Sequence, residues 1–509
     1  MSKLKKWQKR LVLSLIIIFG LIFLGAVILS TYTAVVNLAP VRIRIDASVR
    51  YQEMEGFGMS GAWTFQDIGT DDEAAEELAD RLYGDNGMKL DTLRYNIGAG
   101  TKEIEHGYDE TRAAESFFVA EKYTSKESFS NPENYDFTRD SAAMNAFDKC
   151  LATGNVKTVV LFANSPHYLL TANGRGNGTN IRENNLPEEN YAAFSDYLLV
   201  ITDFFREKLS ALDNPPAIYI SPVNEPQWKW GGADATQEGC HFDPVPLAKF
   251  YDVFYTKLKA YNEATDGNIK PDFFESGDYR LSLIGQTKFK KYIKEFKKYP
   301  FFSELEHISV HSYNVNDSRL KRKSFTRYAK RNLKGLSIHM SEYCIMRGGL
   351  DYSIDTGIES AGIIMKDLTL LSASQWCWWL GASNGEYEDG LVYYTKEDGA
   401  FNFFTTKRYY TMSQFTRFIS AGDTRIKAET RDKNGLDGLE ICAFEKADGK
   451  IIAVLINHRG RDRKISLPSG YTLTGATVTD SERNMESVPC ENFKIPEKSV
   501  VTLEFKKSS

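Results

Sequence analysis

The distribution of hydrophobic and polar positions divides the chain into three parts. The first part, up to Pro40, holds one long apolar stretch. From residue 55 to 418, short apolar runs alternate with stretches whose apolar residues recur at helical spacing. From residue 419 onward, runs of strand-forming residues are separated by Gly, Asp and Asn. The pattern therefore predicts a membrane-length segment, an α/β unit and a small β unit, in that order.

The apolar runs of the middle part are typical of buried strands. They are Glu55–Trp63, Leu90–Gly98, Val156–Ser165, Ala217–Glu225, Asp272–Gly277, His307–Tyr313, Leu336–Tyr343 and Ser374–Leu380. Strands that alternate with helices predict a parallel sheet covered on both faces. Eight such units in roughly 360 residues predict an α/β fold of the (β/α)8 TIM-barrel type with some long loops. The alternative is a doubly wound open sheet, but no glycine-rich phosphate loop follows the first run.

Helix signals lie between these runs. Thr70 and Glu73 match a capping box, and Gly84 is placed to end that helix. Pro187 stands at the first turn of an amphipathic stretch that reaches about Lys208. Three further helices are expected over 243–263, 354–371 and 405–419.

The C-terminal runs predict a small antiparallel β-sandwich. They are Leu439–Phe444, Ile451–Ile456, Thr472–Val478 and Val500–Phe505. The stretch Val41–Val49 alternates apolar and polar residues ahead of the barrel, so we expect it to join the sandwich. The predicted organisation is a signal or anchor segment at 1–40, an N-terminal strand at 41–54, a barrel at 55–418 and a sandwich at 419–509.

The N-terminal segment has the composition of an exported protein's leader. Five Lys and Arg residues precede Leu11–Pro40, which contains no charged residue. Its most apolar part, Leu11–Leu29, is about long enough to cross a ~30 Å hydrocarbon core. The flanking positive charges predict a cytoplasmic N-terminus. No clean small-x-small cleavage site follows, which favours an uncleaved anchor over a signal peptide. In both cases we expect the rest of the chain to be extracellular.

Composition narrows the classes of partner. The net charge of −5 provides no basic field for nucleic acid, and the Lys/Arg runs at 287–298 and 319–334 read as solvated helix faces. The six cysteines show no CxxC or Cys/His spacing, so neither a metal site nor a disulfide framework is expected. A single bridge between Cys442 and Cys490 is left open. No organic cofactor is implied.

Candidate functional residues stand at the C-terminal ends of the predicted strands, where barrel enzymes place their chemistry. Only two of these residues are carboxylates, and they end the fourth and seventh strands. The set is Trp63, Arg94, Asn96, Asn164, Asn224, Glu225, His311, Tyr313, Glu342 and Trp378.

Two glutamates facing each other across a barrel mouth suit glycoside hydrolysis, which uses one carboxyl as acid and another as base or nucleophile. Glu225 lies beside proline and aromatic residues, where a drier setting would raise its pKa and suit an acid. Glu342 is expected near Arg94, which would keep it ionised. Tyr313 shares a strand face with His311 and is placed to donate to Glu342. The alternatives are a structural ion pair for Arg94 and core packing for the His, Tyr and Trp side chains.

The same residues carry a resemblance to glycoside hydrolase family 30, and within it to the branch of endo-β-1,6-galactanases. The matching segments are 56–63, 93–98, 164–166, 221–228, 237–240, 311–313 and 341–343. The resemblance implies a barrel with a flanking sandwich, with Glu225 as acid/base and Glu342 as nucleophile of a retaining hydrolase. It also implies that Asn224 binds the sugar 2-hydroxyl and that Arg94 and Tyr313 orient Glu342.

The resemblance defines the substrate less closely than the reaction. Relatives tend to carry a second proline and a methionine where this chain has His167–Leu170, which puts linkage and chain-length preference in question. The loop Ala172–Asn184 is expected to shape the same cleft. β-1,6-Glucan, xylan and glucosylceramide-like glycosides are alternative substrates to β-1,6-galactan side chains of arabinogalactan. A non-catalytic polysaccharide-binding protein and an envelope transglycosylase are alternatives of other classes.

Overall fold

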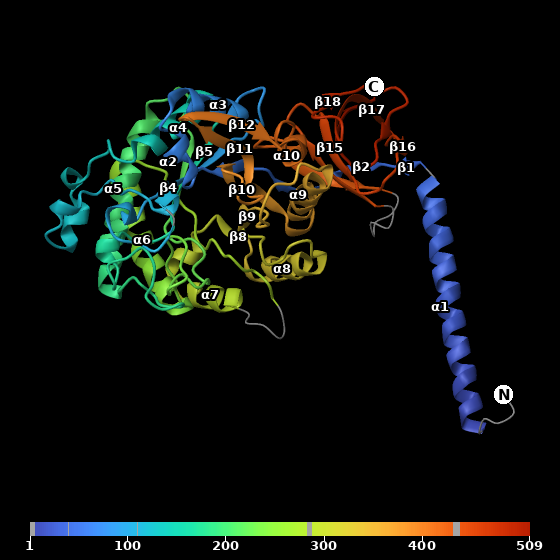
Figure 1. The fold of residues 1–509 in the computed structure, drawn as a ribbon, viewed down its shortest axis with the longest axis horizontal. Helices are drawn as coiled ribbons and strands as arrows, with labels where there is room; N and C mark the ends of the chain where they lie inside the picture. The colour runs from blue at the N-terminus through green and yellow to red at the C-terminus, as the bar shows by residue number, and fades with distance from the viewer. Residues whose placement is uncertain (1–5, 39, 109, 282–287, 431–437, 509) are drawn as a thin grey trace.

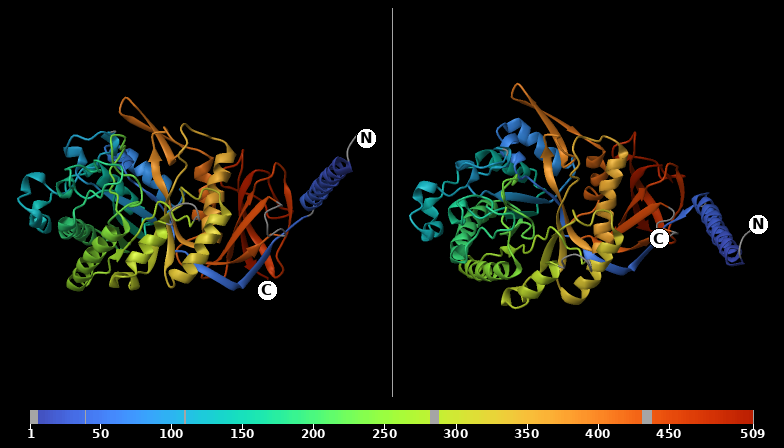
Figure 2. Two further views of the ribbon diagram at one scale, coloured as in Figure 1. Left: turned by 90° about the horizontal axis from the view of Figure 1, so that it is seen from below. Right: turned by 60° about the horizontal axis from the view of Figure 1, so that its bottom comes forward.

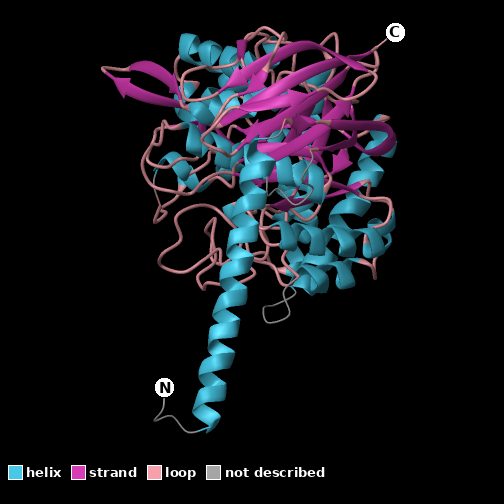
Figure 3. Cartoon of the chain, turned by 90° about the vertical axis from the view of Figure 1, so that its right-hand side faces the viewer, coloured by secondary structure: helices cyan, strands magenta, loops and turns pink. Residues whose placement is uncertain are grey.

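The computed structural model describes residues 6–38, 40–108, 110–281, 288–430 and 438–508. Helix α1 (Lys6–Leu38) projects from a body formed by a barrel and a β-sandwich (Figure 1). Within Lys6–Ile28 an 18-residue window has a mean hydropathy of 3.1, and the length and composition of this span are those of a membrane-spanning or signal segment. Figure 3 shows the helix running away from the side of the molecule that carries the sandwich strands.

Eight parallel strands form the barrel, as the apolar runs predict. They are β3 (Gly56–Ser60), β4 (Thr92–Ile97), β5 (Thr158–Ala163), β6 (Ala217–Ser221), β7 (Lys270–Pro271), β8 (His307–His311), β9 (Ser337–Tyr343) and β10 (Ala373–Ser383). Each pairs with the next from β3 to β7 and from β8 to β10, and β10 pairs with β3. For example, Arg94 lies opposite Val160 and Trp376 opposite Phe57.

The fifth predicted strand differs from the observed one. Strand β7 covers only Lys270–Pro271, and the predicted run 272–277 joins the sheet through isolated parallel bridges. Glu275 pairs with Asn224, and Ser276 pairs with Val310, which closes the barrel between β7 and β8. Phe274 has φ 61°, and this turn of the backbone interrupts a regular ladder.

Helices cover the outside of the barrel. They are α2 (Thr64–Ile68), α3 (Asp72–Tyr83), α4 (Ser141–Ala152), α5 (Tyr191–Ser210), α6 (Pro244–Thr265), α7 (Lys288–Phe296), α8 (Arg319–Asn332), α9 (Ile354–Lys366) and α10 (Lys407–Thr416). Helix α3 ends at Gly84 as expected, but the predicted capping box is wrong. Asp71 is the N-cap and accepts from the Ala74 amide, whereas the Thr70 hydroxyl donates to the Asp67 carbonyl.

A hairpin that the sequence pattern does not predict follows β10. Strands β11 (Gly390–Glu397) and β12 (Ala400–Thr405) are antiparallel, and β11 continues the barrel sheet by pairing with β10. The hairpin projects from the barrel as the orange loop in Figure 2.

The sandwich consists of two sheets. Its strands are β1 (Val41–Arg42), β2 (Arg44–Glu53), β13 (Thr424–Glu429), β14 (Leu439–Glu445), β15 (Ile451–Asn457), β16 (Arg463–Ser466), β17 (Tyr471–Thr479), β18 (Glu486–Ser487), β19 (Lys494–Ile495) and β20 (Ser499–Lys507). One sheet has the order β18-β17-β20-β15-β14-β13-β2 and the other β1-β16-β19. One face of the larger sheet packs against helices α9 and α10, and this contact attaches the sandwich to the barrel.

All six cysteines are free thiols, so the bridge left open between Cys442 and Cys490 does not form. Cys442 belongs to the core between the large sheet and the barrel, whereas Cys490 packs against the core between the two sandwich sheets. The sheet therefore separates the two side chains.

Candidate active site

Glu225 and Glu342 meet at the C-terminal end of the barrel. Glu342 lies on β9, and Glu225 follows β6 by four residues. The two residues are 5% and 4% exposed, and a carboxylate oxygen of one lies within 4.8 Å of a carboxylate oxygen of the other. This spacing agrees with the ~5–5.5 Å of retaining glycosidases and is too short for the ~6.5–9.5 Å that inverting enzymes need for water.

Two hydrogen bonds hold the Glu342 carboxylate. Nη1 of Arg94 donates to Oε2 over 3.1 Å, and the Tyr313 hydroxyl donates to Oε1 over 3.0 Å. Burial raises the pKa of Glu342, and the guanidinium and the phenol both act to lower it. The predicted contacts of Arg94 and Tyr313 with Glu342 are therefore present.

Glu275 is a third buried carboxylate that the sequence interpretation missed. It has no exposed surface, and both of its oxygens accept from Nη2 of Arg94, at 2.8 and 2.9 Å. Burial raises the pKa of Glu275, Arg94 opposes this shift, and the charges of Asp272 and Glu342 add to it. The available signal was a glutamate inside the apolar run Asp272–Gly277.

His311 contacts the other member of the pair. Its Nδ1 lies 2.8 Å from Oε1 of Glu225 and 3.7 Å from Oε1 of Glu342. Burial and the nearby Arg94 charge hold the pKa of His311 well below its usual range, so the ring is neutral. A neutral imidazole can exchange a hydrogen bond with Glu225 in either protonation state of that carboxyl.

The surroundings of Glu225 favour its protonated form. Burial raises the pKa of Glu225 well above its usual range, and the negative charges of Glu342 and Glu275 raise it further. An ideal Cβ on Gly277 would lie 2.6 Å from Oε1 of Glu225 and 2.8 Å from Nε1 of Trp228. The glycine therefore leaves the space that the carboxyl and the indole occupy.

The backbone is strained at three points of this site. Trp63, Glu225 and Phe274 have φ values of 63°, 41° and 61°, in the left-handed region that side chains rarely adopt. The Glu225 amide donates to the Glu275 carbonyl over 3.0 Å, and Nε1 of Trp230 donates to the Glu225 carbonyl over 2.8 Å. These bonds hold the strained conformation, as is common where a catalytic side chain must be aimed.

The three asparagines of the predicted set form one chain beside Glu225. Nδ2 of Asn224 donates to Asn164 over 3.0 Å, and Nδ2 of Asn164 donates to Asn96 over 3.1 Å. All three are buried. Nδ2 of Asn96 and Oδ1 of Asn224 are buried and have no hydrogen-bond partner among the described residues.

On β10 the tryptophan that faces the site is Trp379, and not the predicted Trp378. Trp378 is fully buried on the outer face of the strand, where Nε1 donates to the Asp389 carbonyl and the ring lies under Arg408. Trp379 points the other way, and its ring centroid is 6.0 Å from the Arg94 guanidinium and 5.3 Å from the Trp63 ring. Successive side chains alternate faces on a strand, so Trp379 replaces Trp378 at the site.

Two loops complete the mouth of the barrel. The Gly178 amide, in the loop Ala172–Asn184, donates to the Trp230 carbonyl over 3.0 Å. His167, in the segment His167–Leu170, is fully buried, and its ring stacks on Tyr168. Its side chain therefore contributes to packing and is not exposed to a ligand.

Comparison with known proteins places this geometry in a family. Residues 40–393 match the model described as O-glycosyl hydrolase family 30, and residues 422–503 match the family 30 β-sandwich domain. An endo-β-1,6-galactanase of Hypocrea rufa is 24% identical over 436 residues, covering 82% of this chain and 81% of the relative.

Solved structures share the whole fold. A conserved exported protein from Bacteroides fragilis superposes with a TM-score of 0.77 at 24% identity, covering 91% of this chain and 99% of that one. The catalytic domain of a family 30 xylanase C from Talaromyces cellulolyticus gives a TM-score of 0.66 at 18% identity, covering 92% and 100%.

Proposed function

Because this chain belongs to glycoside hydrolase family 30, whose members are retaining enzymes, we propose that Glu225 and Glu342 carry out its double displacement. The observation that carries the proposal is the pair of buried carboxyls within 4.8 Å of each other, each with different partners. Glu342 is bonded to Arg94 and Tyr313 and acts as the nucleophile. Glu225 lies among negative charges with a raised pKa and acts as the acid.

The reaction follows from these roles. Glu225 gives its proton to the glycosidic oxygen while an oxygen of Glu342 attacks the anomeric carbon, so the leaving sugar departs as an alcohol. The covalent glycosyl ester on Glu342 is then cleaved by water, whose proton returns to Glu225. In the first step the negative charge moves from Glu342 to Glu225, and Nδ1 of His311 lies 2.8 Å from the Glu225 carboxyl and 3.7 Å from that of Glu342.

The substrate we propose is β-1,6-linked galactan, cleaved within the chain. The support is the endo-β-1,6-galactanase relative, which aligns over 82% of this chain. The Trp63–Trp379 pair beside the carboxylates supplies aromatic surface of the kind that a sugar ring requires. The apolar helix α1 supports export, with the barrel outside the cell.

The test is turnover of the full-length protein, kept in detergent, on β-1,6-galactan, β-1,6-glucan and xylan. We expect oligosaccharides of mixed length from galactan, with the β-anomer formed first. Preferred cleavage of glucan or xylan would overturn the substrate but not the chemistry. Chain-transfer products in place of hydrolysis would indicate a transglycosylase, and binding without turnover a polysaccharide-binding protein.

A further inference from the structure

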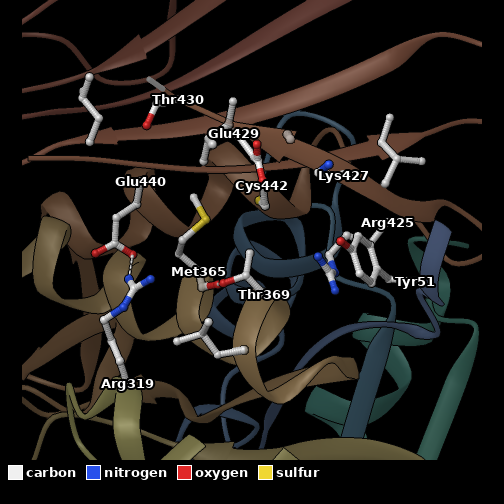
Figure 4. A pocket seen from close by; sticks show the side chains of 15 residues that line it. Tyr51, Arg319, Met365, Thr369, Arg425, Lys427, Glu429, Thr430, Glu440 and Cys442 are labelled. Carbon is white, nitrogen blue, oxygen red and sulfur yellow. Dashed lines mark hydrogen bonds and ion pairs between the residues drawn. The ribbon is translucent and has the colours of Figure 1, made fainter. Parts of the chain in front are cut away.

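A second pocket lies between the barrel and the sandwich, apart from the carboxylate site. Its volume is about 270 Å³. It is lined by Tyr51 of β2, by Arg425 and its neighbours on β13, and by residues of β14. From the barrel side it is lined by Arg319 of α8, Met365 of α9 and Thr369, which follows α9. Figure 4 shows Arg425 and Tyr51 on one side of the pocket and Arg319 with Glu440 on the other.

Arg425 is held rigidly at this pocket. The residue is 6% exposed, and its guanidinium carbon lies 3.7 Å from the centroid of the Tyr51 ring. Nε donates to Oε1 of Gln52 over 2.7 Å. Gln52 in turn donates to the carbonyls of Leu368 and Ala373, over 2.8 and 3.0 Å, which ties it to the barrel. A guanidinium that stacks by its face and bonds through Nε leaves the edge formed by Nη1 and Nη2 for another partner.

Among the described residues, no carboxylate lies within ion-pair distance of Arg425. Burial lowers the pKa of its guanidinium to about 10. Glu440, which also lines the pocket, is engaged by Lys366 at 3.2 Å and by His458 at 3.4 Å. A buried cation without a counter-charge is costly, so an anion at the free edge would be stabilised strongly.

The other lining groups suit a sugar. Tyr51 is 45% exposed and offers an aromatic surface beside the guanidinium, and Thr369 and Thr430 line the pocket with hydroxyl-bearing side chains. The volume lies just below the ~300–1,000 Å³ of drug-sized sites, which is room for one ring and not for a chain. Arg319 adds a second cation whose contact with Glu440 is long, at 3.8 Å.

We propose that this pocket binds a single uronic acid residue, with its carboxylate paired to the Nη1 and Nη2 edge of Arg425. Such a site would hold an acidic side group of a polysaccharide while the barrel acts on the chain. The inference uses the family's substrate class and does not depend on the catalytic roles of Glu225 and Glu342.

Calorimetric titration of the full-length protein in detergent tests the proposal, with glucuronate, galacturonate, galactose and inorganic phosphate as separate ligands. We expect at least one uronate to bind and galactose and phosphate to bind at least about tenfold more weakly. Arg425→Gln should weaken uronate binding by about tenfold or more, because it removes a charge-assisted bond. Arg50→Gln is the matched control, since Arg50 lies on the same sheet, pairs with Glu445 and does not line the pocket.

The outcomes separate this site from the catalytic one. Uronate binding that survives Glu225→Gln but is lost in Arg425→Gln supports the proposal. Binding that is lost in Glu225→Gln and kept in Arg425→Gln places the uronate in the barrel and overturns it. Equal binding of phosphate and uronate, or no uronate binding by the folded wild-type protein, overturns it as well.

Discussion

Arg94 and Glu275 form a two-point ion pair that solvent does not reach, with oxygens 2.8 and 2.9 Å from Nη2, although 181 positions separate them in the chain. The same guanidinium donates to Glu342. One cation therefore connects a carboxyl in the proposed reaction to one outside it, and the charge of Glu275 also raises the pKa of Glu225.

Replacing Glu275 by Gln should move the pH profile of kcat/KM to lower pH. Removal of a negative charge makes Glu225 ionise more readily, so the loss of activity at high pH begins earlier. Without Glu275, the Arg94 guanidinium interacts more strongly with Glu342 and lowers the pKa of that carboxyl. The acid limb of the profile therefore also shifts to lower pH. A rate that falls equally at every pH would show a structural role only.

Asp367→Asn is the control for that experiment. Asp367 forms an equally buried ion pair with Arg322 over 2.7 Å, outside the barrel. Loss of this pair should lower the free energy of unfolding by about 3 kcal/mol and leave the pH profile in place.

Replacing Tyr313 by Phe should shift only the acid limb, and to higher pH. The phenol stabilises the ionised form of Glu342, so its removal raises the pKa of that carboxyl and activity is lost earlier as the pH falls. We expect kcat to fall by about tenfold to hundredfold. Tyr255→Phe removes a similar bond to Glu304 at the surface and should change neither quantity.

The two proposed catalytic roles can be told apart with leaving groups. Glu342→Gln should reduce kcat by about 10⁴-fold or more on every substrate, because no nucleophile remains. Glu225→Gln should fail on galactan but form the glycosyl-enzyme rapidly from an aryl galactoside whose leaving group needs no proton. Glu359→Gln, at an exposed position, should retain full activity.

The opposite pattern would reverse the assignment. If Glu342→Gln is rescued by the aryl galactoside and Glu225→Gln is not, Glu225 is the nucleophile. Near-normal activity of either variant on galactan would remove that residue from the mechanism.

Replacing Gly277 by Ala should reduce activity more than stability. The added methyl would lie 2.6 Å from Oε1 of Glu225, so the carboxyl must move. We expect a fall in kcat of about 10²-fold and a loss of about 1–3 kcal/mol in unfolding free energy. Gly460→Ala introduces the same methyl into open space in the sandwich and should change kcat little. Unchanged kinetics in Gly277→Ala would show that the carboxyl tolerates the displacement.

The sequence is sufficient to predict the barrel, the sandwich and the position of the two glutamates. Apolar runs bounded by turn residues identify strands because buried parallel strands need apolar side chains on both faces. A charged residue at the end of such a run stands out for the same reason. Glu225 and Glu342 are therefore visible in a single sequence, and Arg94 and Tyr313 can be placed near them from strand order.

What only the tertiary structure decided is which side chains those strands bring together. Glu275 lies inside a run whose regular pairing is broken at Phe274, so its contact with Arg94 depends on how the barrel closes and not on any local pattern. Trp378 and Trp379 are equivalent in hydrophobicity and differ only in the face of β10 from which they project. A shift of one residue exchanges the two faces of a strand, and that register is set by contacts between segments hundreds of residues apart.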